Sequence, residues 1–240
     1  MFGIDISGFQ PGIDLSVVPC DFVGIYVSGG IASTNPDARR QVSQAIDEGK
    51  RIILYHFEND GTPGTVQQEA AWYLRQVNSL GQLPANTLYA LDNETGNARN
   101  VLWQMQFLST ARAERGPGCG MYGPYTNIKD GIYQPLRDAG YFIWESAYIL
   151  GATRIVGYNP PAGRAPIPGG DPEIWQFTPS LVLPGWGGLL DGNVFFGGPA
   201  EWDALAGATT QAASGPVAPI KELTDDEKFF SIELGIPLPI

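Results

Sequence analysis

The sequence is poor in basic residues and in side chains that bind transition metals. Its 240 residues include 14 Lys and Arg against 25 Asp and Glu, which gives a net charge of −11 at pH 7. Because nucleic-acid phosphates bind to positively charged surfaces, we expect no nucleic-acid partner. One histidine and two cysteines are too few for the usual structural zinc sites. We therefore expect no cofactor and no transition metal, although an oxygen-ligated cation is not excluded.

Long apolar runs are also absent. No stretch of about 18 apolar residues occurs, so the sequence predicts no membrane span. No basic segment followed by an apolar one comes after Met1, and we therefore expect no signal peptide. The 31 glycines and 20 prolines argue against a helical bundle, while 43% hydrophobic residues argue against disorder. A chain of this length is expected to form one large domain, alone or with an appendage.

From residue 2 to about residue 178, apolar segments of strand length alternate with helix-like segments. This alternation predicts an α/β fold with a mostly parallel sheet. The expected strands are residues 2–7, 22–28, 51–57, 87–94, 120–125, 141–147 and 173–178. The expected helices are residues 36–49, 65–80, 97–115 and 128–139, with Asn35 as an N-cap and Gly49, Gly81 and Gly116 as stop signals.

The composition changes near the end of the chain. Residues 179–198 are dense in glycine and proline, which predicts loop and short strand. Residues 206–219 carry no charge and are rich in Ala, Gly, Thr and Ser, which is typical of a linker. We expect a single domain over residues 1–205 and a linker and tail over residues 206–240. The tail either packs back on the domain, is partly disordered, or serves as a docking or oligomerisation peptide.

Four acidic residues stand at the polar ends of apolar segments. Asp92 and Glu94 are two residues apart at the end of a predicted strand, which places both on one face. Asp5 ends the first strand, and Asp191 begins a polar segment near the end of the domain. If parallel strands close into a barrel, their carboxyl ends meet at one rim and these acids form one cluster. One of several close carboxyl groups can then be held protonated, as a general acid requires, although solvated loop carboxylates are the alternative.

The order of several short motifs resembles the family 25 glycoside hydrolases, the lysozymes common in bacteriophage lysins and actinobacteria. The matching segments are GIDIS at residues 3–7 with Phe9 and Gln10, ID at 13–14, YHF at 55–57, LDNE at 91–94, WQFT at 175–178 and DGN at 191–193. The resemblance implies a single catalytic domain with an irregular TIM-like (β/α) barrel. It also implies cleavage of the β-1,4 bond between N-acetylmuramic acid and N-acetylglucosamine in peptidoglycan.

Carried over by position, the resemblance implies that Glu94 is the proton donor to the glycosidic oxygen. Asp92, Asp5 and Asp191 would shape the charge around the sugar. The spacing of these residues leaves open whether a second carboxylate or the substrate's own acetamido group attacks the sugar. The sequence departs from the family at residues 27–30, VSGG, where many members carry an acidic residue before a glycine. A polar contact in the cleft is expected to be absent there.

Aromatic side chains on or just past the predicted strands can stack on sugar rings. We expect substrate binding by Tyr55, Tyr122, Trp144, Tyr148 and Trp175, together with Gln176 of the WQFT segment. For each ring, a place in the hydrophobic core is the alternative. His56 is interpreted as a structural histidine with satisfied hydrogen bonds, and a cysteine peptidase or amidase built from His56 with Cys20 or Cys119 is the minor alternative. The sequence does not tell whether the two cysteines pair.

Together these features predict a peptidoglycan hydrolase of the phage lysin or virion-associated lysozyme type. It would be found in the host cytoplasm or the virion and act on the bacterial cell wall, with other phage proteins as partners through residues 206–240. One alternative is a non-catalytic wall-binding or structural module of a phage particle. A weaker alternative is a glycosidase of the same fold that acts on another polysaccharide.

Overall fold

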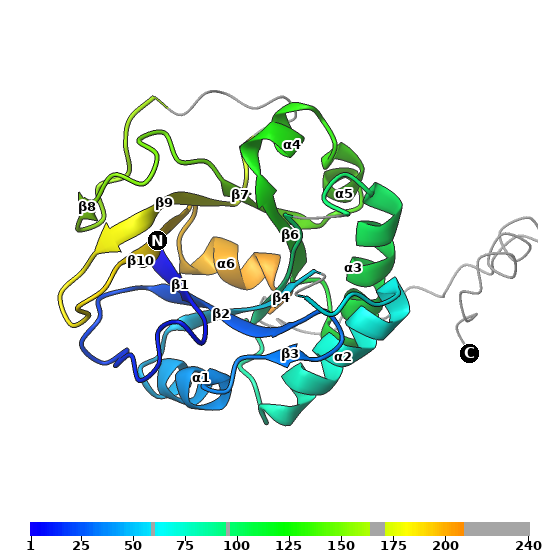
Figure 1. Cartoon of the computed structure of the whole chain (residues 1–240), viewed down its shortest axis with the longest axis horizontal. Coiled ribbons are helices and arrows are strands. Elements are labelled where there is room, and N and C mark those ends of the chain that lie inside the picture. Colours follow the sequence, from blue (N-terminus) through cyan, green and yellow to red (C-terminus); the bar gives the residue numbers. More distant parts are fainter. Residues whose placement is uncertain (59–60, 95–96, 164–170, 209–240) are drawn as a thin grey trace, which may run out of the picture. The chain divides into compact units, whose positions relative to one another are not determined.

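Eight strands close into one barrel in the computed structural model, which describes residues 1–58, 61–94, 97–163 and 171–208 (Figure 1). In order around the ring they are β1 (Phe2–Ile6), β2 (Phe22–Gly29), β4 (Arg51–Phe57), β5 (Leu88–Asp92), β6 (Cys119–Pro124), β7 (Phe142–Ser146), β9 (Ile174–Val182) and β10 (Leu190–Phe195). Neighbours from β1 to β9 pair in parallel, whereas β10 pairs antiparallel with both β9 and β1. The predicted irregular TIM-like barrel is confirmed.

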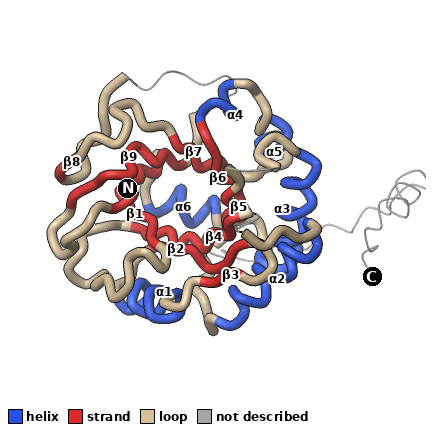
Figure 2. The backbone as a smooth tube through the Cα atoms, viewed as in Figure 1, coloured by secondary structure: helices blue, strands red, loops and turns tan. Residues whose placement is uncertain are grey.

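Helices cover only part of the barrel wall. They are α1 (Ala38–Asp47), α2 (Val66–Ser79), α3 (Val101–Arg115), α4 (Tyr125–Lys129), α5 (Gln134–Asp138) and α6 (Pro199–Leu205). Figure 2 shows loops, rather than helices, beside β9 and β10. Two short strands extend the sheet: β3 (Ser33–Thr34) pairs with β2, and β8 (Ile155–Val156) pairs with β9. The regular alternation of strand and helix is therefore restricted to the β2–β7 part of the ring.

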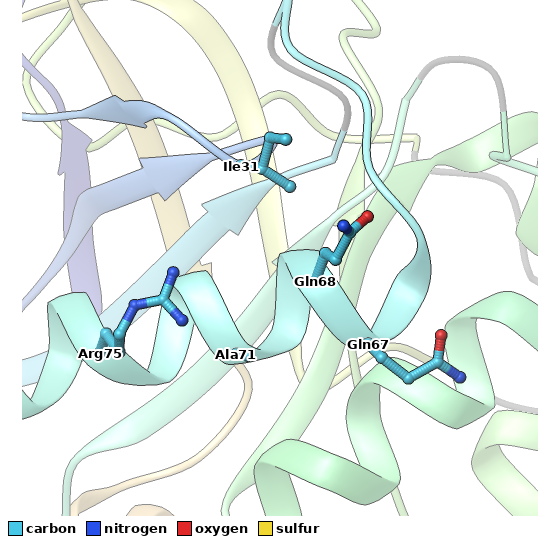
Figure 3. A pocket seen from close by; sticks show the side chains of 5 residues that line it. All are labelled: Ile31, Gln67, Gln68, Ala71 and Arg75. Carbon is cyan, nitrogen blue, oxygen red and sulfur yellow. The ribbon is translucent and has the colours of Figure 1, made fainter.

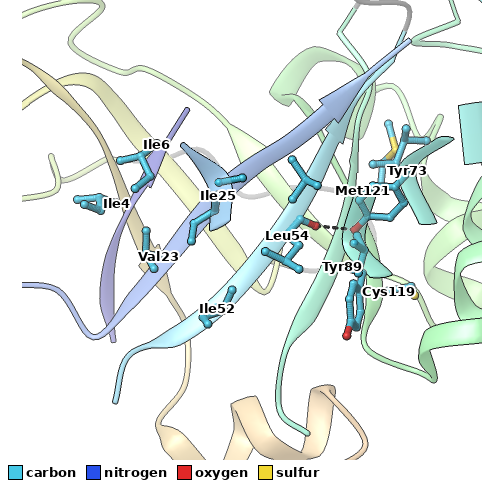
Figure 4. Close-up of a cluster of buried hydrophobic side chains, with 14 of the residues drawn as sticks. Ile4, Ile6, Val23, Ile25, Ile52, Leu54, Tyr73, Tyr89, Cys119 and Met121 are labelled. Carbon is cyan, nitrogen blue, oxygen red and sulfur yellow. Dashed lines mark hydrogen bonds between the residues drawn. The ribbon is translucent and has the colours of Figure 1, made fainter. Parts of the chain in front are cut away.

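Side chains on the outer face of the strands form the larger core, against the helices. Because successive strand residues point to opposite faces, Ile4, Val23 and Leu54 point outward, away from the barrel axis (Figure 4). Tyr73 of α2 packs in the same layer, and its hydroxyl donates a hydrogen bond of 2.8 Å to the carbonyl oxygen of Leu54 (Figure 4). The face of α2 that carries Tyr73 therefore contacts the sheet.

The inside of the barrel holds a second, separate core that α6 closes at one end. It contains Phe22, Ile53, Leu88, Phe142, Ile174 and Phe195. Trp202 of α6 packs on the rings of Phe22 and Phe195 at centroid distances of 5.1 and 5.2 Å. Its indole nitrogen donates to the carbonyl oxygen of Asn86, just before β5 begins. The helix therefore closes the amino-terminal end of the parallel strands and leaves the carboxyl end open.

Several features differ from the sequence predictions. Two short helices, α4 and α5, replace the single helix expected over residues 128–139, because Gly131 between them adopts a left-handed φ of 74° that interrupts a helix. The helix expected from residue 36 begins at Ala38 with Asp37 as its N-cap, while the Asn35 side chain accepts a hydrogen bond from the Asp37 amide. The strand expected to end at residue 178 continues to Val182. β10 lies within residues 179–198, where loop and short strand were expected, and α6 was not predicted.

The described residues extend slightly past the predicted domain boundary. Ala206, expected in the linker, is buried in the inner core beside α6. The compact unit that contains the barrel includes all described residues up to Ala208. Residues 209–240 lie outside the described residues, so the hypotheses about the tail stay predictions. None of the helices in the described ranges is both long and apolar enough to cross a bilayer.

Gly24 of β2 offers a test of how tightly the inside of the barrel is packed. A Cβ at this position would lie 2.8 Å from the Trp144 ring and 2.9 Å from the Asp5 Cβ, so Gly24→Ala must displace one of them. We expect a loss of about 1–3 kcal/mol in the free energy of unfolding, measured by urea denaturation. Gly187→Ala is the matched control, because no atom lies within 4 Å of a Cβ there. Equal stability of the two variants would contradict the packing described.

Candidate active site

A cleft of about 640 Å³ opens at the carboxyl end of the parallel strands. The carboxylates of Asp5, Asp92, Glu94 and Asp191 all line it. Asp5 comes from β1, Asp92 ends β5 with Glu94 two residues later, and Asp191 lies directly opposite Asp5 in the antiparallel pairing of β10 with β1. Closure of the barrel thus brings together four acids that are far apart in the sequence.

Asp5 is the most enclosed of these acids, with 7% of its surface exposed. Its Oδ2 accepts hydrogen bonds from Gln176 Nε2 at 2.8 Å and from Asn193 Nδ2 at 2.6 Å. Burial raises the pKa of Asp5 to about 6, because the lost hydration outweighs these two donors, which lower the pKa, and Glu94 raises it further. Asn193 is itself fixed, since its Oδ1 accepts a bond of 2.8 Å from Trp144 Nε1.

Burial also raises the pKa of the two other strand-end aspartates. The pKa of Asp191 rises to about 8, with smaller contributions from the negative charges of Asp5 and Glu94. The pKa of Asp92 lies well above its usual range, again first through burial and then through Glu94, Asp5 and Asp191. The Oδ1 atom of Asp92 is buried and has no hydrogen-bond partner. Burial and the neighbouring negative charges therefore favour the protonated forms of these carboxyl groups.

Glu94 differs from its three neighbours because its side chain is exposed to solvent. It lines the cleft just beyond the end of β5, on the same face as Asp92. A ligand in the cleft can thus reach the Glu94 carboxyl group, while the aspartates lie deeper between the strands. This placement suits a group that exchanges a proton with a bound molecule.

Three of the five predicted sugar-binding rings line the cleft, together with Gln176. Tyr55, Tyr122 and Tyr148 are among the lining residues. The hydroxyls of Tyr122 and Tyr148 both donate to Gln176 Oε1, the former at 2.7 Å. The same amide thus joins two tyrosines to Asp5, and one hydrogen-bonded network runs across the floor of the cleft.

The structure does not bring Trp144 and Trp175 to the cleft. Trp144 is 2% exposed and packs inside the barrel against the edges of Tyr55 and Tyr122. Trp175 is 4% exposed, belongs to the outer core, and donates its indole N–H to the carbonyl oxygen of Ala147. Both rings are therefore part of the hydrophobic core, which was the alternative to sugar binding. Strand alternation explains Trp175, since its neighbour Gln176 faces the inside.

Several lining residues were not selected from the sequence. Tyr26, Phe57 and Asn35 line the cleft, as does Phe9, which is 90% exposed. Tyr26 could have been found by alternation along its predicted strand, because it is paired with Tyr55 in the parallel register of β2 and β4. Asn193, the second donor to Asp5, was part of a quoted motif but was not assigned to the site. No sequence signal pointed to Ser33 and Thr34, since the β2–β3 hairpin was not predicted.

His56 lies outside the cleft, on the outer face of β4. Its ring is fully buried, bonds Ser28 Oγ at 3.0 Å and Glu69 Oε2 at 3.2 Å, and stacks on Phe107. The prediction of a structural histidine is confirmed. Ser28, in the segment where the family often has an acid, faces this histidine and does not line the cleft.

The two cysteines are free thiols in the structure. Burial raises the pKa of Cys20 to about 11 and that of Cys119 to about 12, which keeps both protonated at neutral pH. A thiolate nucleophile, as the cysteine peptidase alternative requires, is therefore disfavoured at either position.

Other surface features offer less chemistry than the carboxylate cleft. A hollow of about 380 Å³ lies against α2, lined by Ile31, Gln67, Gln68, Ala71 and Arg75 (Figure 3). It contains no carboxylate, thiol or imidazole. Within the described part of the chain, no group of three or more His, Cys, Asp or Glu side chains is arranged to hold a metal ion. The cleft at the strand ends is therefore the candidate active site.

Comparison with protein families links this cleft to a known group of enzymes. The family model described as "Glycosyl hydrolases family 25" matches residues 4–186. The matched range contains Asp5, Asp92 and Glu94 and ends just before β10, which carries Asp191. No curated protein matches the sequence.

Solved structures of proteins from several organisms share the fold of this chain. The muramidase of Trichobolus zukalii is 21% identical, with a TM-score of 0.66 over 87% of this chain and 100% of that one. The bacterial lysozyme of Streptomyces coelicolor is 20% identical, with a TM-score of 0.64 over 86% and 96% of the two chains. The catalytic domain of an endolysin from a bacteriophage of Listeria monocytogenes is 19% identical, with a TM-score of 0.62 over 86% and 97%. These similarities establish the common barrel.

The raised pKa values predict an unusual dependence of stability on pH. Asp5 and Asp191 release their protons at about pH 6 and about pH 8 in the folded chain, but near pH 4 when unfolded. Since the folded state binds more protons between these limits, the free energy of unfolding should fall as the pH rises from about 4 to about 8. Urea denaturation at a series of pH values measures this slope.

Asp191→Asn should flatten the slope between about pH 6 and pH 8, because it removes the group with the higher pKa. Asp14→Asn is the control: hydrogen bonds from Ser16 lower the pKa of this exposed carboxyl, so it does not titrate in the window. If Asp191→Asn kept the wild-type slope, the assignment of the raised pKa to Asp191 would be wrong.

Proposed function

Because the chain belongs to glycosyl hydrolase family 25, it is a glycoside hydrolase, and we propose that its substrate is peptidoglycan. The bond cleaved is the β-1,4 linkage between N-acetylmuramic acid and N-acetylglucosamine. The observation that carries this proposal is the convergence of Asp5, Asp92, Glu94 and Asp191 on one open cleft. Glycosidic bonds are hydrolysed by pairs of carboxyl groups, one of which protonates the leaving oxygen.

We assign the proton donor to Glu94. Among the four acids it is the one whose side chain is exposed within the cleft, so a glycosidic oxygen can approach it. Protonation of that oxygen lets the leaving sugar depart as a neutral alcohol, which avoids an alkoxide in water. The Glu94 carboxylate that results can then take a proton from the attacking water and regain its acid form.

Asp92 is better suited to orient the substrate than to attack it. Burial raises its pKa well above the usual range, which favours the neutral form, and a neutral carboxyl group is a weak nucleophile. Its buried Oδ1 has no partner within the protein and can pair with a polar group of the substrate. This favours the acetamido group of the sugar, held by Asp92, as the internal nucleophile. Asp5, which has the lower pKa of about 6, would stabilise the positive charge that develops on the sugar ring, and Asp191 lies opposite it.

The tyrosines suit a carbohydrate ligand. Tyr55, Tyr122 and Tyr148 present ring faces and hydroxyls to the cleft, and Phe9 adds an exposed ring at its border. No Lys or Arg lines the cleft, so binding relies on stacking and hydrogen bonds rather than on attraction to anionic wall polymers. The net charge of −11 supports the same conclusion.

The biological setting we propose is that of a phage lysin or virion-associated lysozyme. The structural similarity to a phage endolysin supports this setting, although bacterial and fungal enzymes share the fold. Residues 206–240 are proposed to contact other phage proteins. The alternative, a wall-binding module without catalysis, is favoured by the VSGG segment, in which Ser28 faces His56 instead of the cleft.

Substitution of the proton donor tests the proposal. We expect the wild-type protein to release muropeptides with reducing N-acetylmuramic acid ends from purified peptidoglycan, as measured by mass spectrometry. Glu94→Gln should reduce this release by about 100-fold or more, since an amide cannot donate the proton. Binding to sedimented walls should be retained, because the side chain keeps its size and polarity.

Glu48→Gln is the matched control, because Glu48 is exposed at the end of α1, outside the cleft, and should retain full activity. If the wild type and Glu94→Gln both released nothing but sedimented with the walls, the protein would be a binding module. In a parallel assay, cleavage of purified chitin oligomers without release of muropeptides from peptidoglycan would instead indicate a different polysaccharide as substrate.

A further inference from the structure

Glu58 is a buried carboxylate that lies outside the cleft. It follows β4 directly, and only 1% of its surface is exposed. Phe57 lines the cleft, so strand alternation directs Glu58 to the outer face of the barrel. Burial of a polar group costs free energy unless hydrogen-bond partners offset the lost hydration, so the partners of Glu58 are informative.

The contacts of Glu58 enclose the segment that carries Glu94. Its main-chain N–H donates a hydrogen bond of 2.8 Å to the carbonyl oxygen of Asp92, two residues before Glu94. Its side-chain Oε1 accepts a bond of 2.6 Å from Asn97 Nδ2, three residues after Glu94. One residue, directly after the neighbouring strand β4, thus contacts the chain on both sides of Glu94.

The next residue along the chain is fixed from the opposite direction. The carbonyl oxygen of Ala98 accepts hydrogen bonds from Gln104 Nε2 at 3.0 Å, Asn127 Nδ2 at 3.0 Å and the Tyr133 hydroxyl at 3.3 Å. These donors come from α3, α4 and the turn before α5. Side-chain contacts therefore hold residues 97 and 98 between the β4 side and the β6 side of the barrel.

We propose that Glu58 is a positioning residue, which holds the Glu94 carboxyl group in place through its bonds to Asp92 and Asn97. The inference rests on the proposed role of Glu94 as proton donor. Glu94 lies beyond the end of β5, where the regular ladder of strand hydrogen bonds has ended, and misplacement by about 1 Å can reduce a rate about 100-fold. The bond between Asn97 and Glu58 adds a constraint from a group outside the cleft.

Three variants separate positioning from general stability. Glu58→Ala and Asn97→Ala each remove the side-chain bond, and we expect each to reduce kcat on purified peptidoglycan about ten- to hundredfold, with KM within about twofold of the wild type. The double variant should be no slower than the more affected single variant, because both remove the same bond. Glu58→Gln keeps an oxygen acceptor for Asn97 Nδ2 and should restore most of the rate.

Hydrogen exchange provides a readout that does not depend on activity. Amides of the peptide that spans residues 92–98 should exchange faster in Glu58→Ala and Asn97→Ala than in the wild type, but not in Glu58→Gln. Thermal unfolding of each variant identifies any that fail to fold. If Glu58→Ala does not fold, Asn97→Ala still tests the inference, because Asn97 is partly exposed.

Unchanged exchange and unchanged kcat in the folded alanine variants would overturn the inference. A change confined to KM, or a Glu58→Gln variant as slow as Glu58→Ala, would also overturn it. Absence of muropeptide release by the wild type would refute the proposed function instead, and the exchange data would still decide whether Glu58 fixes the segment.

Discussion

A carboxyl group held inside the barrel, that of Asp5, is the constraint on which the arrangement of the site depends. Its burial is tolerated because Gln176 and Asn193 donate to the same oxygen from β9 and β10. Those strands are where the ring departs from all-parallel pairing, since β10 runs antiparallel between β9 and β1. The antiparallel return also brings Asp191 opposite Asp5. The irregularity of the barrel is thus the feature that supplies both the donors and the fourth acid.

Much of the framework could be read from the sequence because it depends on local patterns. Residues 51–57 form a strand built around the apolar run from Ile52 to Tyr55, and Thr65 with Gln68 forms the capping box that starts α2. The clustering of Asp5, Asp92, Glu94 and Asp191 could also be predicted, since barrel closure and the position of an acid at a strand end determine it together. These predictions did not require knowledge of the side-chain contacts between distant segments.

What the sequence did not reveal depends on contacts between distant segments. β10 contains Gly192 and Asn193 and has no continuous apolar run, so its pairing with β1 and β9 has no local signal. The seven residues of α6 are too few to show a helical period, and its Trp202 is explained only by the inner core that it closes. The positions of Trp144 and Trp175 could not be predicted for the same reason, because the sequence does not tell whether an aromatic side chain on a strand contacts the core or a ligand.

Because α6 closes one end of the barrel, the part that stabilises the fold and the part that forms the cleft lie at opposite ends of the barrel axis. Phe22, Phe195 and Trp202 fill the amino-terminal half with a dry apolar core, whereas the cleft occupies the opposite end. Residues that border the cleft can therefore change during evolution at little cost to folding, because the packing that stabilises the chain is located elsewhere. Such a scaffold can acquire specificity for a different wall polymer by replacing side chains at the rim, without a redesign of its core.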